Sequence, residues 1–376
     1  MPGTRAAIAV LGTGTMGAMT LWRLTRRGIP AVGLEQFAPG HDRSAAGGET
    51  RIFRTAYLEG PQYVPLLQEA QALWRELEAE TGRPLLNLTG GLMIGSLSSP
   101  DIRNVLDSIR AYDLPHEILD PAAARSRYPQ HQIGADEIMV LDKQAGFLRP
   151  ELAVLLAASA AERAGAAVER YTRIDAIEPG SDGVTVHADG TERRFDRVVV
   201  AGGAWSGRLL PQLAPWIQPR RLVSTWFAAR QPESFTPGRF PIFVRSSASV
   251  HMSGVPSVDG AGVKISGNNK SDISDPDSLD RTVPATDLKS VRDAVGRLLP
   301  GLYPDPIRVS AYVEGYTPDG HALVGALPGN DRVIVLTGFS GHGFKMSPVM
   351  GDIAADLLLD GKTNRAVDHL APARFG

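Results

Sequence analysis

Three glycines at fixed spacing follow the first apolar run of the chain and point to phosphate chemistry. Gly12, Gly14 and Gly17 come directly after apolar residues 6–11, and an acid, Glu35, ends the next apolar run. The first glycine allows a tight strand-to-helix turn, the second lets the backbone approach a pyrophosphate, and the third lets helix and strand pack closely. The helix N-terminus then faces the phosphates, and the acid binds ribose hydroxyls. The spacing predicts a dinucleotide-binding βαβ unit. A plain glycine turn is the alternative, and the motif does not separate FAD from NAD.

The elements that must position these residues can be read from the apolar spacing. Residues 15–27 have helical periodicity and Gly28 stops them, while residues 31–34 form the second strand. Residues 37–50 are rich in Gly, Ser and charge and indicate a loop near the cofactor, which Arg51 and Arg54 follow. Further along, the pattern predicts a helix over residues 63–81, a strand over 86–96 that enters a new sheet, and a helix over 149–164.

The middle and the end of the chain show two further patterns. Residues 167–170, 173–179, 184–187 and 193–195 are predicted to form a meander beside the nucleotide-binding unit, and residues 196–201 a buried parallel strand that ends in Gly202-Gly203-Ala204-Trp205. Alternating strands at 222–228, 242–245, 250–254 and 262–266, with a helix at 288–298, indicate an antiparallel sheet. A strand at 333–336, a glycine-rich loop at 338–345 and a helix at 347–358 suggest a second cofactor contact at a helix start.

Composition narrows the class of protein. The chain has 376 residues, of which 43% are hydrophobic and 21% charged, and its net charge is -2, so we expect a small-molecule partner rather than nucleic acid or a membrane surface. It has no signal-peptide pattern and no apolar stretch of about 20 residues, which favours a cytoplasmic protein. The absence of cysteine excludes disulfides, a cysteine nucleophile and a flavin attached through sulfur. The eight histidines show no paired spacing, so we expect no metal.

Three separated signals together resemble a flavoprotein amine oxidase. They are the N-terminal glycines with Glu35, the VVVAGGAW run at 198–205 and the GFSGHGFK run at 338–345. Over nearly its whole length the chain resembles the monomeric sarcosine oxidase and N-methyltryptophan oxidase branch of the D-amino-acid-oxidase-like FAD family. Its most specific matching pieces are Thr50-Arg51-Ile52-Phe53-Arg54, Thr317-Pro318-Asp319 and residues 338–345.

The resemblance implies an α/β plus antiparallel β fold. It implies a Rossmann-like, discontinuous FAD-binding domain from residues 1–85, 146–217 and 318–376, and a substrate-binding domain on an antiparallel sheet from residues 86–145 and 218–317. The active site is then expected between the two domains, where pockets are common.

Carried over by position, four cations receive roles. Arg51 lies beside the flavin ring, Arg54 and Lys345 hold the substrate carboxylate, and Lys264 promotes reaction with oxygen. The chemistry suits these residue types, since arginine binds a carboxylate with a planar fork, lysine adds a point charge, and a fixed cation stabilises charge that develops on dioxygen. The alternatives are that Arg51 and Arg54 are solvated surface charges and that Lys264 points to solvent by strand alternation.

Departures from the family pattern bear on the cofactor and the substrate. Tyr312 stands where the covalent members have the cysteine that bonds the flavin, so FAD is expected to be noncovalent. Glu314 replaces an aromatic residue of the substrate site, and Asn268 replaces a histidine. The Glu314 carboxylate is a candidate for attracting a cationic amine or a polar substituent, the alternative being a solvated or salt-bridged loop glutamate.

The remaining candidates follow from the same resemblance. Ser253 is placed with Arg54, Lys345, Glu314 and Asn268 in the substrate site. His342 joins Lys264 and Arg51 as a catalytic candidate, with a role in proton transfer, although a lone histidine is more often structural. Trp205 is expected at the cofactor, or packed beneath its domain. The cofactor contacts fall on Gly12, Gly14, Thr15, Met16, Gly17, Glu35, Gln36, Ser44, Thr50, Arg51, Val168, Gly202, Gly203, Trp205, Gly338, Phe339, Gly341, His342, Gly343, Phe344 and Lys345.

The expected activity is that of an FAD-dependent oxidase of a small carboxylate-bearing amine. The substrate is an N-alkyl or N-carboxymethyl amino acid, a sarcosine-like compound or glycine. Hydride transfer to the flavin gives an imine that hydrolyses, and O2 is reduced to H2O2. Two alternatives stay open: a dehydrogenase of the same fold that passes electrons to a carrier, and a non-catalytic dinucleotide-binding module. We expect a monomer or a small homo-oligomer.

Overall fold

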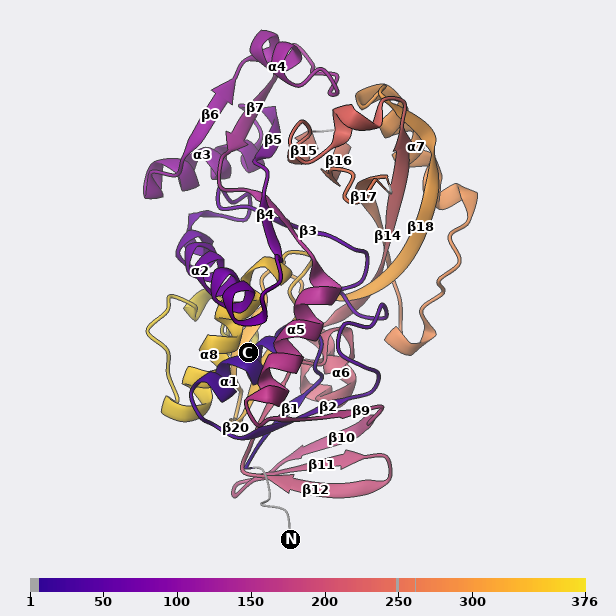
Figure 1. Cartoon of the computed structure of the whole chain (residues 1–376). Helices are drawn as coiled ribbons and strands as arrows, with labels where there is room; N and C mark the ends of the chain where they lie inside the picture. Colours follow the sequence, from indigo (N-terminus) through magenta and orange to yellow (C-terminus); the bar gives the residue numbers. More distant parts are fainter. Residues whose placement is uncertain (1–6, 248–249, 261) are drawn as a thin grey trace.

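The computed structural model describes residues 7–247, 250–260 and 262–376, without the side chains of residues 268 and 269. The molecule contains two large sheets, one toward each end of its long axis (Figure 1). A six-stranded, mostly parallel sheet lies toward the N-terminus in this view, and an eight-stranded, mostly antiparallel sheet lies at the other end. The predicted fold class, α/β plus antiparallel β, is confirmed. In the described part of the chain, no helix combines the length and the apolar character that crossing a bilayer requires.

The six-stranded sheet has the order β19-β20-β13-β1-β2-β9. Its strands are β1 (Ile8–Leu11), β2 (Ala31–Glu35), β9 (Ala167–Arg170), β13 (Arg197–Val200), β19 (Leu323–Leu327) and β20 (Asn330–Thr337). All neighbours are parallel except β19 and β20, and Leu11 pairs with both Leu34 and Val200. Residues from three distant parts of the sequence therefore meet in one sheet, while the domain boundaries stay a prediction.

Alternation along these strands divides their side chains between two cores. Val10 and Val199 face one core with the helices, while Leu11 and Val200 face the other. Because both faces are covered, the strands read as continuous apolar runs rather than alternating ones.

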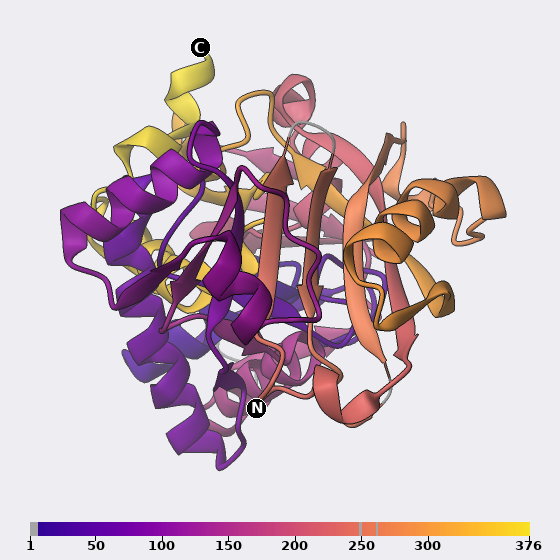
Figure 2. The same ribbon diagram turned by 90° about the horizontal axis from the view of Figure 1, so that it is seen from above.

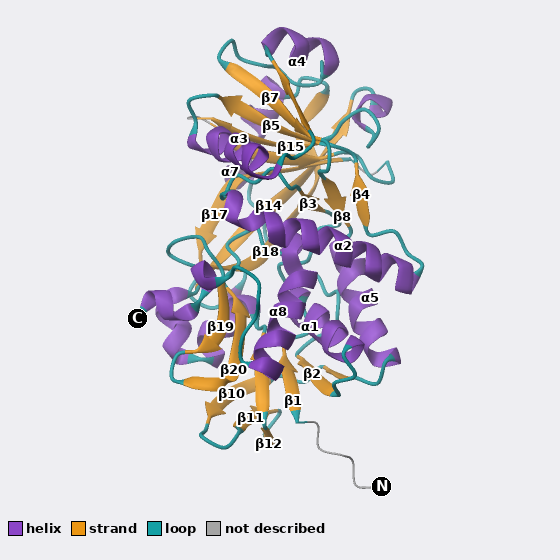
Figure 3. Ribbon diagram, turned by 90° about the vertical axis from the view of Figure 1, so that its left-hand side faces the viewer, coloured by secondary structure: helices purple, strands orange, loops and turns teal. Residues whose placement is uncertain are grey.

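The helices α1 (Thr15–Arg26), α5 (Pro150–Arg163) and α8 (Ser347–Asp360) lie side by side on one face, with α2 (Val64–Thr81) next to them (Figure 3). The opposite face carries a meander of β10 (Ile174–Pro179), β11 (Val184–Ala188) and β12 (Thr191–Phe195), together with α6 (Ser206–Leu209). Residues 167–170 were predicted to belong to this meander, which is wrong. They form β9, whose Val168 pairs with Gly33 of β2, because this strand extends the parallel sheet directly after α5.

The eight-stranded sheet has the order β18-β14-β17-β16-β15-β5-β7-β6. Its strands are β5 (Gly91–Ser96), β6 (His116–Leu119), β7 (Glu137–Asp142), β14 (Gln218–Ala229), β15 (Ile242–Ser247), β16 (Val250–Val255), β17 (Val263–Asp272) and β18 (Leu302–Tyr316). The β15–β5 pair is parallel, and it joins the strands of residues 91–142 to the strands of residues 218–316 in one sheet. Three helices accompany the sheet, α3 (Pro100–Tyr112), α4 (Pro121–Arg127) and α7 (Ala285–Leu298); α7 lies against β17 and β18 (Figure 2).

A small sheet of β3 (Arg51–Phe53), β8 (Gly146–Leu148) and β4 (Leu86–Leu88) lies where the chain passes between the large sheets. The single strand predicted over residues 86–96 is wrong. It is two strands, β4 and β5, which break at Gly90 with a φ of 77° and belong to different sheets. The strand β3 was not predicted, and it fixes Arg51 by pairing with Leu148.

Helices α1 and α8 cross at a glycine that brings their backbones close together. A Cβ atom built on Gly351 would lie 2.7 Å from the carbonyl carbon and oxygen of Met19. Arg23 and Arg27 of α1 bind Asp352 beside this contact, with N–O distances of 2.9 and 2.8 Å. This crossing ties the glycine-rich turn before α1 to the loop before α8.

We predict that Gly351→Ala lowers the free energy of unfolding by about 1–3 kcal/mol, because the added methyl group has no room between two backbones. The matched control is Gly296→Ala in α7, where the Cβ would lie 3.8 Å from Pro304 Cβ. That change is expected to be neutral or to stabilise by up to about 1 kcal/mol through helix propensity. Urea unfolding followed by circular dichroism measures both, and equal midpoints for the two variants would contradict this packing.

Candidate active site

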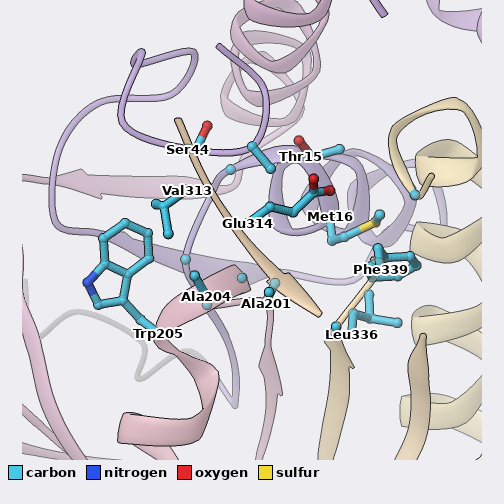
Figure 4. A pocket seen from close by; sticks show the side chains of 18 of the residues that line it. Thr15, Met16, Ser44, Ala201, Ala204, Trp205, Val313, Glu314, Leu336 and Phe339 are labelled. Atoms are coloured by element: carbon cyan, nitrogen blue, oxygen red, sulfur yellow. The ribbon is translucent and has the colours of Figure 1, made fainter. Parts of the chain in front are cut away.

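A long groove opens at the carboxyl ends of β1, β2, β13 and β20. The space, which is open to solvent, amounts to about 1210 Å³. Its lining joins the turn after β1, the loop after β2, the segment after β13, and the loop after β20 (Figure 4). Trp205, Phe339, Leu336 and Glu314 are among its side chains. This is the crevice where open parallel sheets bind nucleotides.

The turn after β1 has the geometry that its glycines predict. Gly12 has a φ of 88°, and a Cβ there would be 2.8 Å from the Ala201 carbonyl oxygen. A Cβ on Gly17 would be 1.8 Å from the Gly12 carbonyl oxygen, so this glycine serves close packing. A Cβ on Gly14 meets nothing within 4 Å, which leaves open space in front of the N-terminus of α1.

The acid at the end of β2 is held rigidly beside this turn. Glu35 is buried, and its carboxylate accepts hydrogen bonds from the backbone N–H of Thr13 at 2.8 Å and of Phe37 at 3.0 Å. The helix N-terminus, the open space at Gly14 and the fixed acid fit the phosphates and a ribose of a dinucleotide.

Most of the residues predicted to bind the cofactor line this groove. They are Gly12, Gly14, Thr15, Met16, Glu35, Gln36, Ser44, Arg51, Gly202, Gly203, Trp205, Gly338, Phe339, Gly341, Gly343 and Phe344. Thr50, His342 and Lys345 line a second cavity next to it instead. Val168 lies outside the described lining of the groove, on β9 beyond β2. Trp205 is half-buried, and its indole N–H donates to Asp277 at 2.7 Å.

The second cavity, here called the substrate cavity, lies between the eight-stranded sheet, β3 and the loop after β20. Its space, also open to solvent, amounts to about 1520 Å³. Six residues line both spaces: Ala45, Arg51, Val313, Glu314, Gly341 and Phe344. The groove and the substrate cavity therefore adjoin, and a flat ring bound at the junction would be exposed to both.

One face of three neighbouring strands forms the floor of the substrate cavity. In the register of the sheet, Ser224 of β14 pairs with Ser266 of β17, and Leu222 pairs with both Lys270 and Tyr312. Directly paired residues and residues two apart share a face. Lys264, Glu314 and Tyr316 lie on the same face by this rule, and all of these residues line the cavity. Ser253 of β16 also lines it, while the side chain of Asn268 lies outside the described part.

Arg54 and Lys345 come together over one tyrosine ring. The Arg54 Cζ atom lies 4.8 Å from the centre of the Tyr57 ring, and the Lys345 Nζ atom lies 5.3 Å from it. The two cations are 6% and 5% exposed. The interpretation of Arg54 as a solvated surface charge is therefore wrong.

Arg54 keeps unused hydrogen-bonding capacity in this buried place. Its Nη2 donates to both carboxylate oxygens of Glu59, at 2.8 and 2.9 Å, while Nε and Nη1 are buried and have no partner among the described residues. Although burial acts in the opposite direction, the Arg54 charge and its cationic neighbours lower the pKa of Glu59 to about 2. A buried unpaired donor costs about 1–3 kcal/mol, so the arginine is set up to accept a further anion.

Lys345 is fixed by hydrogen bonds, and its pKa is lowered. Its Nζ donates to the His342 carbonyl oxygen at 2.8 Å and to the Tyr57 hydroxyl at 3.4 Å. Trp74 Nε1 donates to the Lys345 carbonyl oxygen at 2.9 Å, which fixes the backbone. Burial, together with the Arg54 charge, lowers the pKa of Lys345 to about 7.

His342 supports this arrangement through both ring nitrogens. Nε2 lies 2.9 Å from the Gly320 carbonyl oxygen and must donate to it, so Nδ1 of the neutral ring accepts from the Tyr57 hydroxyl at 3.0 Å. Burial lowers the pKa of His342 to about 4, so the ring is neutral at physiological pH. Both nitrogens are engaged, and the geometry favours a positioning role for His342 over proton transfer with a substrate.

Lys264 points inward from β17, which excludes the alternative of a solvent-facing lysine. It is 6% exposed, and its Nζ donates to the carbonyl oxygens of Gly48 and Thr50 at 2.7 and 3.1 Å. The Trp226 ring lies beneath it, 5.4 Å from Nζ to the ring centre. Burial, with the nearby Arg51 charge, lowers the pKa of Lys264 well below its usual value.

Arg51 and Glu314 lie at the junction of the two spaces. The Arg51 guanidinium donates to the backbone carbonyls of Thr50, Ala45 and Gly47, which fixes it against the preceding loop. Glu314 is half-buried on β18, not in a loop, and the described residues place no cation within ion-pair distance of it. Burial raises the pKa of Glu314, and the charges of Arg51 and Lys270 act against this shift.

Several residues of the site were missed from the sequence: Tyr57, which contacts Arg54, Lys345 and His342, and the cavity-lining residues Glu59, Asp101, His251, Lys270 and Tyr316. Tyr57 and Glu59 follow Arg54 within five residues, which was a usable signal. The alternation of Tyr312, Glu314 and Tyr316 also predicts one strand face, yet β18 was not recognised as a strand. Asp101 and His251 carried no signal, because only the folded sheet places them in the cavity. The described residues contain no cluster of His, Asp and Glu that could hold a metal ion.

Comparison with known proteins yields matches over nearly the whole chain. A family described as DAO, FAD dependent oxidoreductase, matches residues 7–357. Monomeric sarcosine oxidase from Streptomyces avermitilis is 36% identical over 373 residues, 98% of this chain and 97% of that protein. N-methyl-L-tryptophan oxidase from Citrobacter koseri is 32% identical over 352 residues, 93% of each. Of the solved structures, NikD, an unusual amino acid oxidase, has a TM-score of 0.85 at 21% identity, and glycine oxidase from Geobacillus kaustophilus 0.82 at 22%, each covering 98% of both chains.

Affinity of the cavity for a carboxylate is predicted to fall as the pH rises through about 7, because Lys345 loses its proton there. Only the ammonium form attracts the anion, and the bound anion in turn raises the pKa of Lys345, so binding takes up protons. The Kd of acetate should rise by up to about tenfold per pH unit above the pKa. Calorimetric titration of the flavin-loaded protein between about pH 6 and pH 9 measures it.

Two variants identify the titrating group. Lys345→Met should bind acetate weakly with little pH dependence, whereas Lys362→Met, an exposed lysine outside both spaces, should behave as the unaltered protein. Glu59 and His342 titrate at about 2 and about 4, below this window. Ionisation of Glu314 would also raise the Kd of acetate as the pH rises, but this pH dependence would persist in Lys345→Met. A flat Kd in the unaltered protein rules out titration of Lys345.

Proposed function

We propose that the protein is an oxidase of a small carboxylate-bearing amine. The premise is that the chain belongs to the DAO family of FAD dependent oxidoreductases. The substrate is an N-alkyl or N-carboxymethyl amino acid of the sarcosine type, or glycine. The convergence of Arg54 and Lys345 over Tyr57, in a cavity that adjoins the nucleotide groove, carries this proposal. The names of the relatives, sarcosine oxidase and N-methyl-L-tryptophan oxidase, support the same substrate class.

The carboxylate of the substrate supplies what the two cations lack. It pairs with the Nε or the Nη1 group of Arg54, neither of which has a partner among the described residues, and keeps Lys345 protonated. Glu59 holds the other side of the guanidinium through Nη2 and so fixes the fork in place. With the carboxylate anchored, the carbon next to nitrogen is directed toward the junction at Arg51 and Glu314.

The amine of the substrate then lies near Glu314. A carboxylate with a raised pKa can attract the cationic amine and take up its proton, which leaves the amine neutral and ready for oxidation. Comparing Glu314→Gln across amine substrates tests this role, because an unchanged preference removes Glu314 from recognition. No other side-chain base is required by the proposal.

The groove residues fit FAD, which supplies a two-electron acceptor for the substrate and a donor for dioxygen when it is bound. The turn at Gly12 and Gly14 and the acid Glu35 hold the phosphates and a ribose, while Arg51 faces the junction with the substrate cavity. The chain has no cysteine for attachment through sulfur, so the cofactor is held noncovalently. Tyr312 occupies the position of the bonding cysteine, and its ring packs against Gly47 and Gly48 of the loop.

Lys264 supplies a fixed polar donor for the oxygen half of the reaction. Two backbone carbonyls and the Trp226 ring hold its Nζ at the cavity wall, close to Arg51. An N–H donor that is already oriented stabilises negative charge on dioxygen without reorganisation. This feature supports an oxidase over a dehydrogenase that passes electrons to a carrier.

A peroxidase-coupled assay of the purified yellow protein tests the proposal. N-methyl and N-carboxymethyl amino acids and glycine are offered under air. The amine is oxidised by two electrons to an imine, water hydrolyses the imine, and one O2 gives one H2O2. We expect about one peroxide per substrate consumed. Rapid dye reduction with negligible peroxide would show a dehydrogenase instead, and no turnover of any carboxylate-bearing amine would overturn the substrate class.

A Lys264→Met variant in the same assay separates the two half-reactions. Reduction of the bound flavin by substrate without air should persist, while peroxide formation should slow by at least about a hundredfold, since one oriented donor is lost. Equal peroxide rates in the variant and the unaltered protein would remove the oxygen role from Lys264.

A further inference from the structure

A second group of polar side chains lies on the floor of the substrate cavity, apart from Arg54 and Lys345. Lys270 of β17 pairs across Leu222 of β14, and Tyr316 of β18 pairs across Gln218 of the same strand. Because residues 218 and 222 are an even number of positions apart, both side chains stand on one face of the sheet. Both line the cavity.

The Tyr316 hydroxyl is buried without a partner. The side chain is 5% exposed, and its Oη atom makes no hydrogen bond within the described part of the chain. Its ring is held between two cations, with Arg220 Cζ at 4.8 Å and Lys270 Nζ at 4.9 Å from the ring centre. A buried hydroxyl normally has a partner, so this one is available for a ligand.

Lys270 contributes a positive charge next to Tyr316, at the rim of the substrate cavity. It is exposed, and no carboxylate of a described residue lies within ion-pair distance of its Nζ. Arg220, by contrast, is bound to Asp272 at 2.8 Å and is not free. The ammonium of Lys270 and the hydroxyl of Tyr316 are both hydrogen-bond donors, so together they suit an acceptor group.

Glu314 lies beside Tyr316 and within electrostatic reach of both Lys270 and Lys345. A methyl group built on Gly341 would be 2.8 Å from Tyr316 Oη and 3.9 Å from a Glu314 carboxylate oxygen, so these two side chains are neighbours. The charges of both Lys270 and Lys345 act on Glu314. The cavity therefore contains two separate groups of cations and one acid on which both groups act.

We propose that the substrate carries a second carboxylate, which binds to Lys270 and the Tyr316 hydroxyl while its first carboxylate binds to Arg54 and Lys345. This inference rests on the proposed function and narrows its substrate class to dicarboxylic amines. The amine lies between the two carboxylates and near Glu314. The second carboxylate can be on the side chain or on the nitrogen substituent, and both kinds share the chemistry that the pair recognises.

The experiment compares kcat/KM of the flavin-loaded protein for three probes. N-methylaspartate carries the second carboxylate on the side chain, N-carboxymethylglycine carries it on nitrogen, and sarcosine lacks it. We expect at least one dicarboxylate to be preferred over sarcosine. Lys270→Met should lower that preference about tenfold, because a charge-assisted hydrogen bond is lost, and Tyr316→Phe should lower it severalfold. The matched control, Lys362→Met, should leave the preference unchanged.

Each result decides the proposal. An unchanged preference in both variants, or sarcosine as the best of the three, overturns it. N-methylserine, a neutral hydroxylated probe, distinguishes hydrogen bonding alone: if it is preferred and Lys270→Met has no effect, the carboxylate assignment is wrong. Calorimetric binding of the same probes separates this inference from the proposed function. A dicarboxylate that binds tightly through Lys270 without being oxidised would support the subsite and contradict the oxidase.

Discussion

The arrangement depends on two cations that are buried over one tyrosine ring without a full set of counter-charges. Removing a charge from water is costly unless it is paired. Among the described residues only Glu59 forms an ion pair with Arg54, and Glu59 and Glu314 act on Lys345 from outside ion-pair distance. The Tyr57 ring and backbone carbonyls offset part of this cost. What remains is unsatisfied donor capacity and a lysine whose pKa is lowered to about 7. A bound carboxylate would pair with these donors and raise the pKa of Lys345, so both features favour binding of an anion.

The fold supplies this pair from opposite ends of the chain. Arg54 follows β3, which is fixed by pairing with β8, and Lys345 ends the glycine-rich loop between β20 and α8. Helix α8 packs on α1 at Gly351, so the loop that carries Lys345 and the turn that faces the nucleotide groove belong to one rigid layer. The eight-stranded sheet adds the opposite wall through one face of β14, β17 and β18. The substrate cavity adjoins the groove at Arg51 of β3, Glu314 of β18 and Gly341 of the loop after β20, which line both spaces.

Much of the nucleotide-binding half could be predicted from local patterns. The glycine turn, Glu35 and the buried strands read clearly because each depends on residues close in sequence, and Gly12 and Gly17 have the contacts that their roles require. The substrate half was harder. Its strand β18 was not recognised, and β4 and β5 were merged, because their partners are distant and only the assembled sheet selects their register. Arg54 and Lys264 were placed through a family resemblance. Their burial, and the contacts of Arg54 with Glu59 and Tyr57, are given by the three-dimensional structure.

A crystal structure of the flavin-loaded protein with a bound carboxylate ligand would test the central claim most directly. The account predicts that the carboxylate oxygens lie within hydrogen-bond distance of Lys345 Nζ and of Arg54 Nε or Nη1, with Glu59 still bound to Arg54 Nη2. A ligand seated elsewhere in the cavity, with those two nitrogens of Arg54 still unpaired, would contradict it.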